Sequence, residues 1–274
     1  MIFNFKSTIL VAEIGWNFLG DIKLAKKMIL VAKKNGADVV KFQIWDPNYL
    51  KDGPWDNDGR KEIYEKSYLN LDKYLKLKNF SKKNNIKCFA SAFTHRGVDL
   101  LIAAKDKVIK IPSHEAYNLD LIQYSLKNFK QVIVSVGALK KNELQKLLKF
   151  RDNKKFIPLH CVSSYPLESK KCNFEKLDYL KNNYKYFGYS GHLDGIEDAV
   201  YAICNGSSII EKHFTLNKRL PGRDNKFAIL PGQLKQLKEW IHLVQDFKIK
   251  KGLGLQKNEF DIFKNYRGRW NETS

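Results

Sequence analysis

This chain of 274 residues has no long apolar run, no cysteines at CxxC spacing and few arginines. No stretch of about 18 consecutive apolar residues occurs, so a transmembrane helix is not expected. The first residues lack the apolar core of a signal peptide. The four cysteines have no CxxC or other metal-binding spacing. We therefore expect reduced thiols in a cytoplasmic protein.

The scarcity of arginine decides how the charge is interpreted. Lys plus Arg total 49 against 29 for Asp plus Glu, a formal net charge of +20, but only seven of the basic residues are Arg. Nucleic-acid surfaces favour Arg and interleaved aromatic side chains, whereas the lysines here are spread along the chain. A lysine-rich, solvated surface is the preferred interpretation, and no nucleic-acid partner is expected. Attraction of a small anionic substrate is the weaker, functional alternative.

Short β-rich runs alternate with amphipathic helical stretches. Strands are predicted over residues 9–14, 38–43, 87–90, 108–111, 131–134, 156–160, 186–188 and 207–211, and helices over 21–35, 71–84, 97–104, 119–127, 141–148, 174–182, 196–204 and 231–245. Such alternation predicts a parallel sheet with helical crossovers, and eight units in about 250 residues match a (β/α)8 TIM barrel. A doubly wound open sheet is the alternative, but the turn at residues 15–20 lacks the GxGxxG pattern.

Two segments lie outside this alternation. Residues 45–70 form a long, polar loop with several aromatic side chains, and loops of that length are usually functional or mobile. Residues 248–274 are basic and interrupted by glycine. We expect a catalytic barrel over residues 1–247 and a basic C-terminal extension over 248–274 that forms no separate domain.

Lysines interrupt two of the predicted strands, at Lys41 and Lys110. A lysine between β-branched or aromatic core residues needs an anionic partner, because burying an unpaired charge is costly. An anionic substrate is the favoured partner, and internal ion pairs with Glu13 or Glu115 are the alternative. Hydroxyl groups at other strand ends would add donors for a phosphate; they belong to Ser91, Ser113, Ser135 and Ser190. Together these residues predict a phosphorylated substrate.

Two histidines, His192 and His213, stand at the ends of the last two predicted strands and should reach the same rim of a barrel. Two imidazoles suit a divalent ion that keeps positions open for water and substrate, although two separately hydrogen-bonded histidines fit the spacing equally well. His160 is expected to be structural, with a backbone partner. Glu115 is a candidate general acid or base, or alternatively a carboxylate at the start of helix 119–127.

Motifs that contain these candidates occur in order between about residues 8 and 246. They are Ala12-Glu13-Ile14-Gly15, Gly36-Ala37-Asp38-Val39-Val40-Lys41-Phe42-Gln43, Lys110-Ile111-Pro112-Ser113, Leu159-His160-Cys161, Tyr165-Pro166, Gly188-Tyr189-Ser190-Gly191-His192, Ile210-Glu211-Lys212-His213-Phe214-Thr215 and Pro221-Gly222-Arg223-Asp224. In these segments the chain resembles the sialic acid synthase family, which includes N-acetylneuraminate, pseudaminic and legionaminic acid synthases.

The resemblance implies a (β/α)8 barrel that condenses phosphoenolpyruvate with a 2-acetamido sugar aldehyde, such as N-acetylmannosamine, to a nonulosonic acid and phosphate. By the family pattern, the phosphoenolpyruvate-binding residues are Lys41, Ser91, Lys110, Ser113, Ser135 and Ser190, and the sugar-binding residues are Glu13, Gln43, Tyr165 and Asp224. A divalent metal, Mn²⁺ or alternatively Mg²⁺ or Co²⁺, would be bound by His192 and His213. Glu115 would assist proton transfer.

The chain departs from the family pattern at several positions. Phe18 and Leu19 stand where the family usually has His-Asn, which removes polar groups from the sugar side. Gly191 stands where the family usually has Asp before the metal-binding histidine. Ser163 stands where the family usually has Asn, and Arg223 where it usually has Pro; Ser91 for Thr is a mild change. The alternatives are therefore a barrel that binds sugar or phosphate without catalysis, or a synthase for a different aldose.

The family usually continues after its barrel into a small antifreeze-like domain that covers the site of a partner subunit. Here only Arg267-Gly268-Arg269 resembles the start of the linker to that domain, so we expect the barrel alone. The resemblance implies a homodimer, and a lid domain supplied by another chain is the alternative source of the missing contact.

Overall fold

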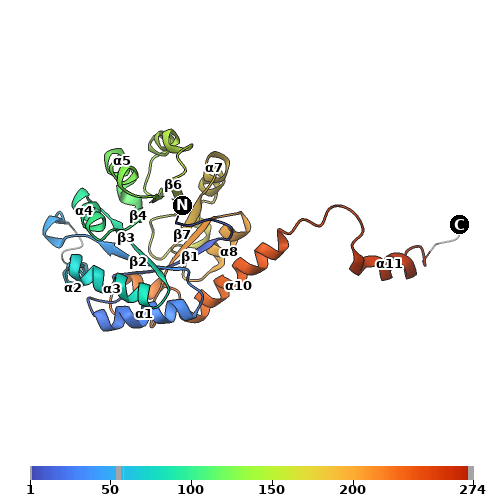
Figure 1. The fold of residues 1–274 in the computed structure, drawn as a ribbon, viewed down its shortest axis with the longest axis horizontal. Coiled ribbons are helices and arrows are strands. Elements are labelled where there is room, and N and C mark those ends of the chain that lie inside the picture. Colours follow the sequence, from blue (N-terminus) through green and yellow to red (C-terminus); the bar gives the residue numbers. More distant parts are fainter. Residues whose placement is uncertain (1, 54–56, 58, 271–274) are drawn as a thin grey trace.

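Eight parallel strands form a closed barrel in chain order, with helices around it (Figure 1). The computed structural model describes residues 2–53, 57 and 59–270, so small parts of the predicted 45–70 loop and of the extension lie outside the described residues. The strands are β1 (Ile9–Gly15), β2 (Val39–Ile44), β3 (Lys87–Ala92), β4 (Val108–Ile111), β5 (Gln131–Ser135), β6 (Phe156–His160), β7 (Gly188–Gly191) and β8 (Ile209–His213). Because β1 pairs with both β2 and β8, the sheet closes and the predicted TIM barrel is confirmed.

Most helices lie in the connections between successive strands and cover the barrel, whereas the last three follow β8. They are α1 (Ile22–Lys34), α2 (Arg60–Lys66), α3 (Leu71–Lys83), α4 (His95–Ala103), α5 (Leu119–Asn128), α6 (Lys141–Lys146), α7 (Glu175–Asn183), α8 (Glu197–Cys204), α9 (Arg223–Phe227), α10 (Pro231–Phe247) and α11 (Phe260–Asn265). Short 3₁₀ helices are η1 (Pro47–Tyr49), η3 (Ser113–Glu115), η4 (Leu147–Phe150), η5 (Ser169–Lys171) and η6 (Lys257–Glu259).

Helix α1 shows how local sequence sets these elements. The Asp21 side chain accepts hydrogen bonds from the first-turn backbone N–H groups of Lys23 and Leu24, which caps the helix. Its buried face has helical spacing and consists of Ala25, Met28, Ile29 and Ala32. Gly36, with φ +90°, allows the chain to turn back toward β2.

Some boundaries differ from the sequence predictions. Strands β7 and β8 begin two residues later than predicted, so residue 190 lies inside β7 rather than after it. The 45–70 loop contains η1 and α2, which were not predicted. Helices α9 and α11 were also not predicted, since each spans less than two full turns and has too few apolar repeats to be recognised.

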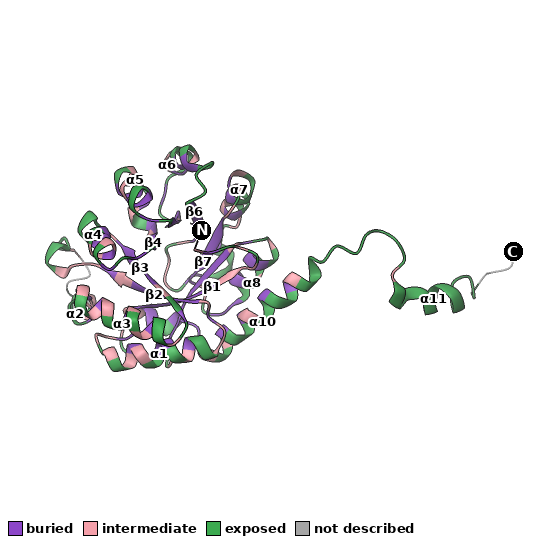
Figure 2. Ribbon diagram, viewed as in Figure 1, coloured by how far each residue is buried: buried purple, intermediate pink, exposed green. Residues whose placement is uncertain are grey.

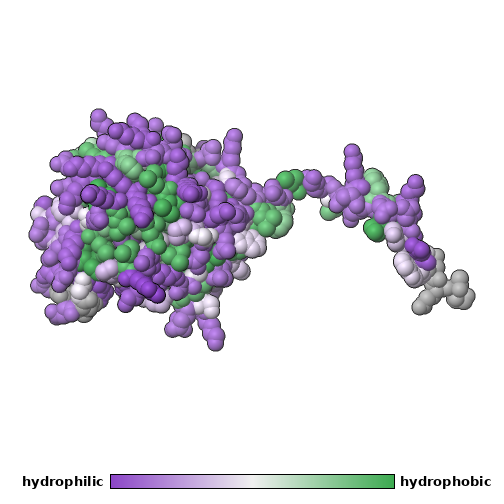
Figure 3. Space-filling model, turned by 90° about the horizontal axis from the view of Figure 1, so that it is seen from below, coloured by the Kyte–Doolittle hydropathy of each residue, from purple (hydrophilic) through white to green (hydrophobic). Residues whose placement is uncertain are grey.

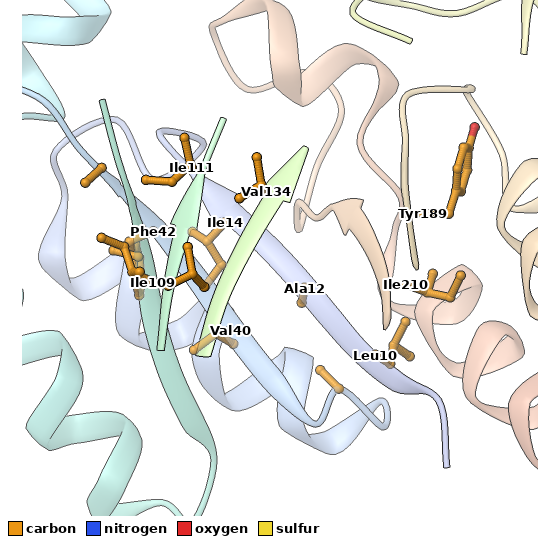
Figure 4. Close-up of a cluster of buried hydrophobic side chains, with 14 of the residues drawn as sticks. Leu10, Ala12, Ile14, Val40, Phe42, Ile109, Ile111, Val134, Tyr189 and Ile210 are labelled. Atoms are coloured by element: carbon orange, nitrogen blue, oxygen red, sulfur yellow. The ribbon is translucent and has the colours of Figure 1, made fainter. Parts of the chain in front are cut away.

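Alternate side chains along the strands separate two cores and place polar groups at one end of the barrel. Figure 4 shows the outward-facing core, with Leu10, Ala12 and Ile14 along β1. The inner core at the N-terminal end consists of Phe3, Val11, Val39, Phe89, Val108, Ile133, Ile157, Leu159 and Ile209. Because side chains alternate, the residues two positions after these strand residues also face inward; among them are Glu13, Lys41, Ser91, Lys110, Ser135 and Glu211.

After α10 the chain leads away from the barrel to α11 (Figure 1). Figure 2 shows buried strands and an exposed tail, in which all residues from 248 to 270 except Gln256 are exposed. Hydrophobic side chains recur along this tail (Figure 3) and include Leu253, Phe260, Ile262 and Trp270. Among the helices of the described residues, none has the length and apolar composition needed to cross a bilayer.

Candidate active site

A cavity of about 250 Å³ opens where the strands end, on the order of twenty times the space that one buried water needs. Every predicted site residue except Glu115 lines it. The lining residues are Glu13, Trp16, Lys41, Gln43, Trp45, Leu50, Tyr64, Ser91, Phe93, Lys110, Pro112, Ser113, His114, Ser135, Cys161, Tyr165, Ser190, His192, Glu211, His213, Arg223 and Asp224. The C-terminal rim is where TIM-barrel enzymes carry their active sites.

The two strand lysines meet at one carboxylate on the floor of this cavity. Lys41 Nζ lies 2.9 Å from Glu211 Oε1 and 3.4 Å from Glu13 Oε2. Lys110 Nζ lies 2.9 Å from both carboxylate oxygens of Glu211. The ion-pair alternative therefore holds for Lys41 with Glu13, but the partner of Lys110 is Glu211 rather than Glu115. These pairs do not exclude an anionic substrate, because both ammonium groups also face the cavity.

The four predicted serines line the same cavity as the lysines, and two of them contact the charged cluster. Lys41 Nζ donates to Ser91 Oγ at 3.1 Å, and Ser190 Oγ donates to Glu211 Oε1 at 3.1 Å. Ser113 Oγ lies 2.6 Å from Ser163 Oγ. The family usually has Asn where Ser163 stands, so this hydroxyl contact belongs to the present chain. Several donors from separate strands thus converge on one small volume, which suits a phosphate.

Burial and the ion pairs shift the pKa values of the two carboxylates, Glu13 and Glu211, in opposite directions. Burial raises the pKa of Glu13 to about 7 against the lowering effect of Lys41. Burial alone would raise the pKa of Glu211, but Lys110 and Lys41 hold it well below its usual range. Burial lowers the pKa of Lys110, partly offset by Glu211. Near pH 7, Glu211 is ionised while Glu13 is divided between its two protonation states.

The two histidines face each other across the rim, with ring centroids 5.6 Å apart. His192 Nδ1 donates to the Val162 carbonyl oxygen at 2.7 Å, which leaves Nε2 with its lone pair. His213 Nδ1 is buried without a hydrogen-bond partner, 3.5 Å from Asp224 Oδ2. Burial lowers the pKa of His192 to about 4, and burial together with His192 lowers that of His213. Both imidazoles are therefore neutral, the form that binds metal.

His192 and His213 can supply only two of the ligands of a divalent ion. Among the described residues, no group of three or more His, Cys, Asp and Glu side chains is placed to hold a metal ion. An ion bound by His192 and His213 would take its remaining ligands from water and substrate, as in catalytic sites with open positions.

Asp224, a predicted sugar-binding residue, has several polar neighbours in the cavity. The Trp16 indole N–H donates to Asp224 Oδ2 at 2.5 Å, and Arg223 Nε lies 3.6 Å from Oδ1. Burial raises the pKa of Asp224 to about 6, opposed by Arg223 and Trp16. The Arg223 guanidinium stacks 4.6 Å from the ring centroid of Tyr165, so the Pro-to-Arg departure adds a cation beside two predicted sugar-binding residues. Gln43 Nε2 donates to Glu13 Oε1 at 2.5 Å.

An aromatic wall, defined as Trp16, Trp45, Tyr64 and Phe93, forms the mouth. Trp16 stacks on Tyr64 with centroids 4.4 Å apart, and Trp45 contacts Trp16 and Phe93 edge-on at 5.1 and 5.6 Å. Trp45 and Tyr64 come from the long loop, so this loop reaches the cavity. Phe18 is different: it is buried and packs edge-on against Phe42. The aromatic wall, and not Phe18, therefore lines the cavity.

Glu115 lies in η3, in the same loop as Ser113, but its side chain does not line the cavity. It is half-buried, and burial raises the pKa of its carboxyl group. His160, expected to be structural, is confirmed as such: its Nε2 lies 2.8 Å from the Cys172 carbonyl oxygen. All four cysteines have free thiols, as predicted.

Sequence reasoning gave no role to Glu211 or to the aromatic wall. The position of Glu211 in the site could have been recognised, since it is two residues before His213 and therefore on the same face of a strand. The wall had a weaker signal in the aromatic residues of the 45–70 loop, whose packing against Trp16 depends on how the loop folds back.

A closed (β/α)8 barrel that gathers two buried lysines, several serines and two neutral histidines in one cavity at its C-terminal rim defines a TIM-barrel enzyme. More specifically, the chain belongs to the NeuB family, whose model matches residues 28–251. This finding confirms the family resemblance of the sequence motifs.

Individual relatives agree with this assignment. The chain is 33% identical over 257 residues to an N,N'-diacetyllegionaminic acid synthase of Campylobacter jejuni, covering 88% of this chain and 77% of that protein. It is 32% identical over 247 residues to a pseudaminic acid synthase of Helicobacter pylori, covering 85% and 73%. Its fold matches the crystal structure of an N-acetylneuraminic acid synthetase from Leptospira borgpetersenii in complex with citrate, with TM-score 0.83, 29% identity and coverage of 97% and 94%.

Proposed function

We propose that this protein condenses phosphoenolpyruvate with an open-chain 2-acetamido sugar aldehyde to give a nonulosonic acid and inorganic phosphate. One observation carries the proposal: Lys41, Lys110 and the serine hydroxyl groups line the same cavity as His192 and His213. The named activities of the relatives, which are synthases of legionaminic and pseudaminic acids, support it.

Phosphoenolpyruvate is assigned to the lysine side because its phosphate and carboxylate both need cationic or hydroxyl donors. In the free protein Glu211 offsets one of the two positive charges of Lys41 and Lys110 and holds both ammonium groups in place, which leaves a net positive charge for an incoming anion. The incoming anion would contact the same ammonium groups from the cavity. Electrostatic attraction is strong there because the lysines and Glu211 are buried.

The sugar is assigned to the side that carries Glu13, Gln43, Tyr165 and Asp224. A divalent ion held by His192 and His213, for which we propose Mn²⁺ with Mg²⁺ or Co²⁺ as alternatives, would polarise the aldehyde oxygen. The aromatic wall favours a sugar with apolar substituents, since aromatic rings pack on apolar faces. The acceptor panel should therefore pair N-acetylmannosamine with a 6-deoxy-2,4-diacetamido hexose.

The reaction joins C3 of phosphoenolpyruvate to the aldehyde carbon, while water adds to C2 and phosphate leaves. The attacking water gives up both of its protons, one on addition and one as the phosphate departs. The aldehyde oxygen gains one proton and the departing phosphate gains the other. Glu13 lies in the cavity with a pKa of about 7, which suits proton exchange near neutral pH. The Glu115 side chain does not line the cavity, so we propose that it takes the proton of the attacking water through a relay.

A steady-state assay of phosphate release tests the proposal, with phosphoenolpyruvate, Mn²⁺ and the acceptor panel. We expect release that requires both the aldose and the metal. If no aldose supports release and calorimetry detects no phosphoenolpyruvate binding, the proposal is wrong. Binding of phosphoenolpyruvate without turnover would instead favour the alternative of a non-catalytic barrel.

Two further expectations accompany this function. Phosphoenolpyruvate is a cytoplasmic metabolite and the thiols are free, so we propose that the protein acts in the cytoplasm. We also propose a homodimer, which light scattering of the purified protein would detect as twice the mass of 31.9 kDa.

A further inference from the structure

A second buried ion pair lies behind the two histidines, on the outer side of the barrel wall. Lys212 of β8 precedes His213, but strand alternation turns its side chain away from the cavity toward α8. Its ammonium group lies 3.1 and 3.2 Å from the two carboxylate oxygens of Asp198 and donates to the Leu193 carbonyl oxygen at 2.9 Å. The exposed fractions of Lys212 and Asp198 are 1% and 3%, so this charge pair is inaccessible to water.

Asp198 contacts more than the lysine. Its Oδ2 accepts a hydrogen bond from the Tyr189 hydroxyl at 3.1 Å and from the Leu193 backbone N–H at 3.4 Å. Its Oδ1 accepts from the Ala199 backbone N–H at 2.8 Å, in the first turn of α8, where a negative charge is favourable. One carboxylate thus connects β7, the loop after it, α8 and β8.

These contacts bear directly on the geometry of the two histidines. Leu193 follows His192 in the chain, and both of its backbone polar groups are held by the Asp198–Lys212 pair. The His192 ring and carbonyl group contact the loop after β6 instead, through the Val162 carbonyl oxygen and the Leu167 N–H. Strand β7 pairs directly with β8, where Gly191 lies opposite Lys212, and the Asp198–Lys212 pair adds a side-chain connection from the residue after His192 to the strand that carries His213.

The glycine before His192 fits this arrangement. A Cβ atom at Gly191 would lie 2.3 Å from Asp198 Oδ2, 2.8 Å from Tyr189 Cε1 and 3.0 Å from Lys212 Cδ. Gly191 has no positive φ, so space and not backbone conformation requires glycine here. The carboxylate of Asp198 occupies the volume that a side chain at position 191, usually Asp in the family, would fill.

We infer that Asp198 is a positioning residue for the metal site: paired with Lys212, it fixes His192 relative to His213, and it supplies from α8 the carboxylate that residue 191 lacks. The inference rests on the proposed function, because it assumes an ion at these histidines. Partners that orient metal ligands typically contribute about 10- to 100-fold to metal affinity.

The first test compares Asp198→Asn with a matched variant, Asp106→Asn. Asp106 is also buried and also contacts a tyrosine hydroxyl and a lysine, those of Tyr74 and Lys78, but it lies at the opposite end of the barrel. We expect both substitutions to lower the melting temperature, and only Asp198→Asn to weaken Mn²⁺ binding in calorimetry, by about tenfold or more. Unchanged Mn²⁺ affinity in Asp198→Asn overturns the inference. If that variant does not fold, Lys212→Met provides the same comparison.

The second test moves the carboxylate. Gly191→Asp alone should weaken Mn²⁺ binding, since its side chain would collide with Asp198. The double variant Gly191→Asp/Asp198→Ala should bind Mn²⁺ more tightly than Asp198→Ala, because the carboxylate returns to Lys212 from β7. A double variant that folds but binds no better than Asp198→Ala contradicts the inference.

A crystal structure of metal-free Asp198→Asn separates this inference from the proposed function. We expect the His192 ring to move relative to that of His213. Unmoved rings overturn the positioning role whether or not a metal binds. Failure of the parent chain to bind Mn²⁺, with moved rings in the variant, would contradict only the metal assignment of the proposed function.

Discussion

Replacing Glu211 with glutamine is expected to destabilise the free protein, because both cavity lysines depend on this carboxylate. Its oxygens lie 2.9 Å from Lys41 and Lys110, and Oε1 also accepts a hydrogen bond from Ser190 at 3.1 Å. Glu211→Gln leaves two buried ammonium groups with Glu13, at 3.4 Å from Lys41, as a remaining anionic neighbour.

The magnitude follows from the burial of the charges. Removing one partner of a buried ion pair costs about 3–5 kcal/mol, and we take about 3 kcal/mol because the glutamine carbonyl keeps one acceptor. For a protein of this size, 1 kcal/mol corresponds to about 2–4 °C in melting temperature, so the expected decrease is about 6–12 °C. Inorganic phosphate should then stabilise Glu211→Gln more than the parent, because it supplies the missing negative charge.

Scanning calorimetry with and without phosphate measures both effects. Asp38→Asn is the control, since it removes a partly exposed carboxylate that pairs with Lys238 at 2.8 Å on the N-terminal side of the barrel. It should cost about 1 kcal/mol or less and gain nothing extra from phosphate. The reasoning is refuted if Glu211→Gln melts with the parent, or if phosphate shifts all three proteins equally.

Three further predictions concern single residues. Burial raises the pKa of Glu13 from 4.5 to about 7, so between these pH values the folded state binds more protons than the unfolded state. The free energy of unfolding should therefore fall as the pH rises through this range. Urea denaturation should show a smaller fall for Glu13→Gln than for the parent, and equal falls would contradict the assignment. Trp16→Phe loses the hydrogen bond to Asp224, so the sugar KM should rise about tenfold in steady-state assays while phosphoenolpyruvate affinity is unchanged. His213→Ala should weaken Mn²⁺ binding by about 100-fold in calorimetry, and unchanged affinity would exclude this ligand.

The architecture was predictable because alternating strand and helix patterns admit few topologies. The errors were local. β7 (Gly188–Gly191) begins and ends with glycine, which has low strand propensity, so the sequence pattern placed this strand too early. Helix α2 forms where the 45–70 loop folds back beside the aromatic wall, and its packing partners are distant in the sequence.

The site residues that could be predicted from the sequence are those whose charge is unusual inside a buried strand. Lys41 and Lys110 stand out because a charged residue inside a buried strand demands a partner. Which partner it finds depends on barrel closure: Glu211 of β8 reaches across to lysines of β2 and β4, a relation that no local pattern contains. The sequence alone also does not explain why glycine stands at position 191, because Asp198, which fills the space of its side chain, belongs to a different element.

A crystal structure of the protein soaked with phosphoenolpyruvate and Mn²⁺ would show directly whether this cavity binds both ligands. We expect the phosphoenolpyruvate anion to contact Lys41 and Lys110, with its phosphate among the serine hydroxyls, and Mn²⁺ to be bound by His192 and His213. Density for both ligands outside this cavity, or a cavity that stays empty at saturating concentrations, would contradict the account.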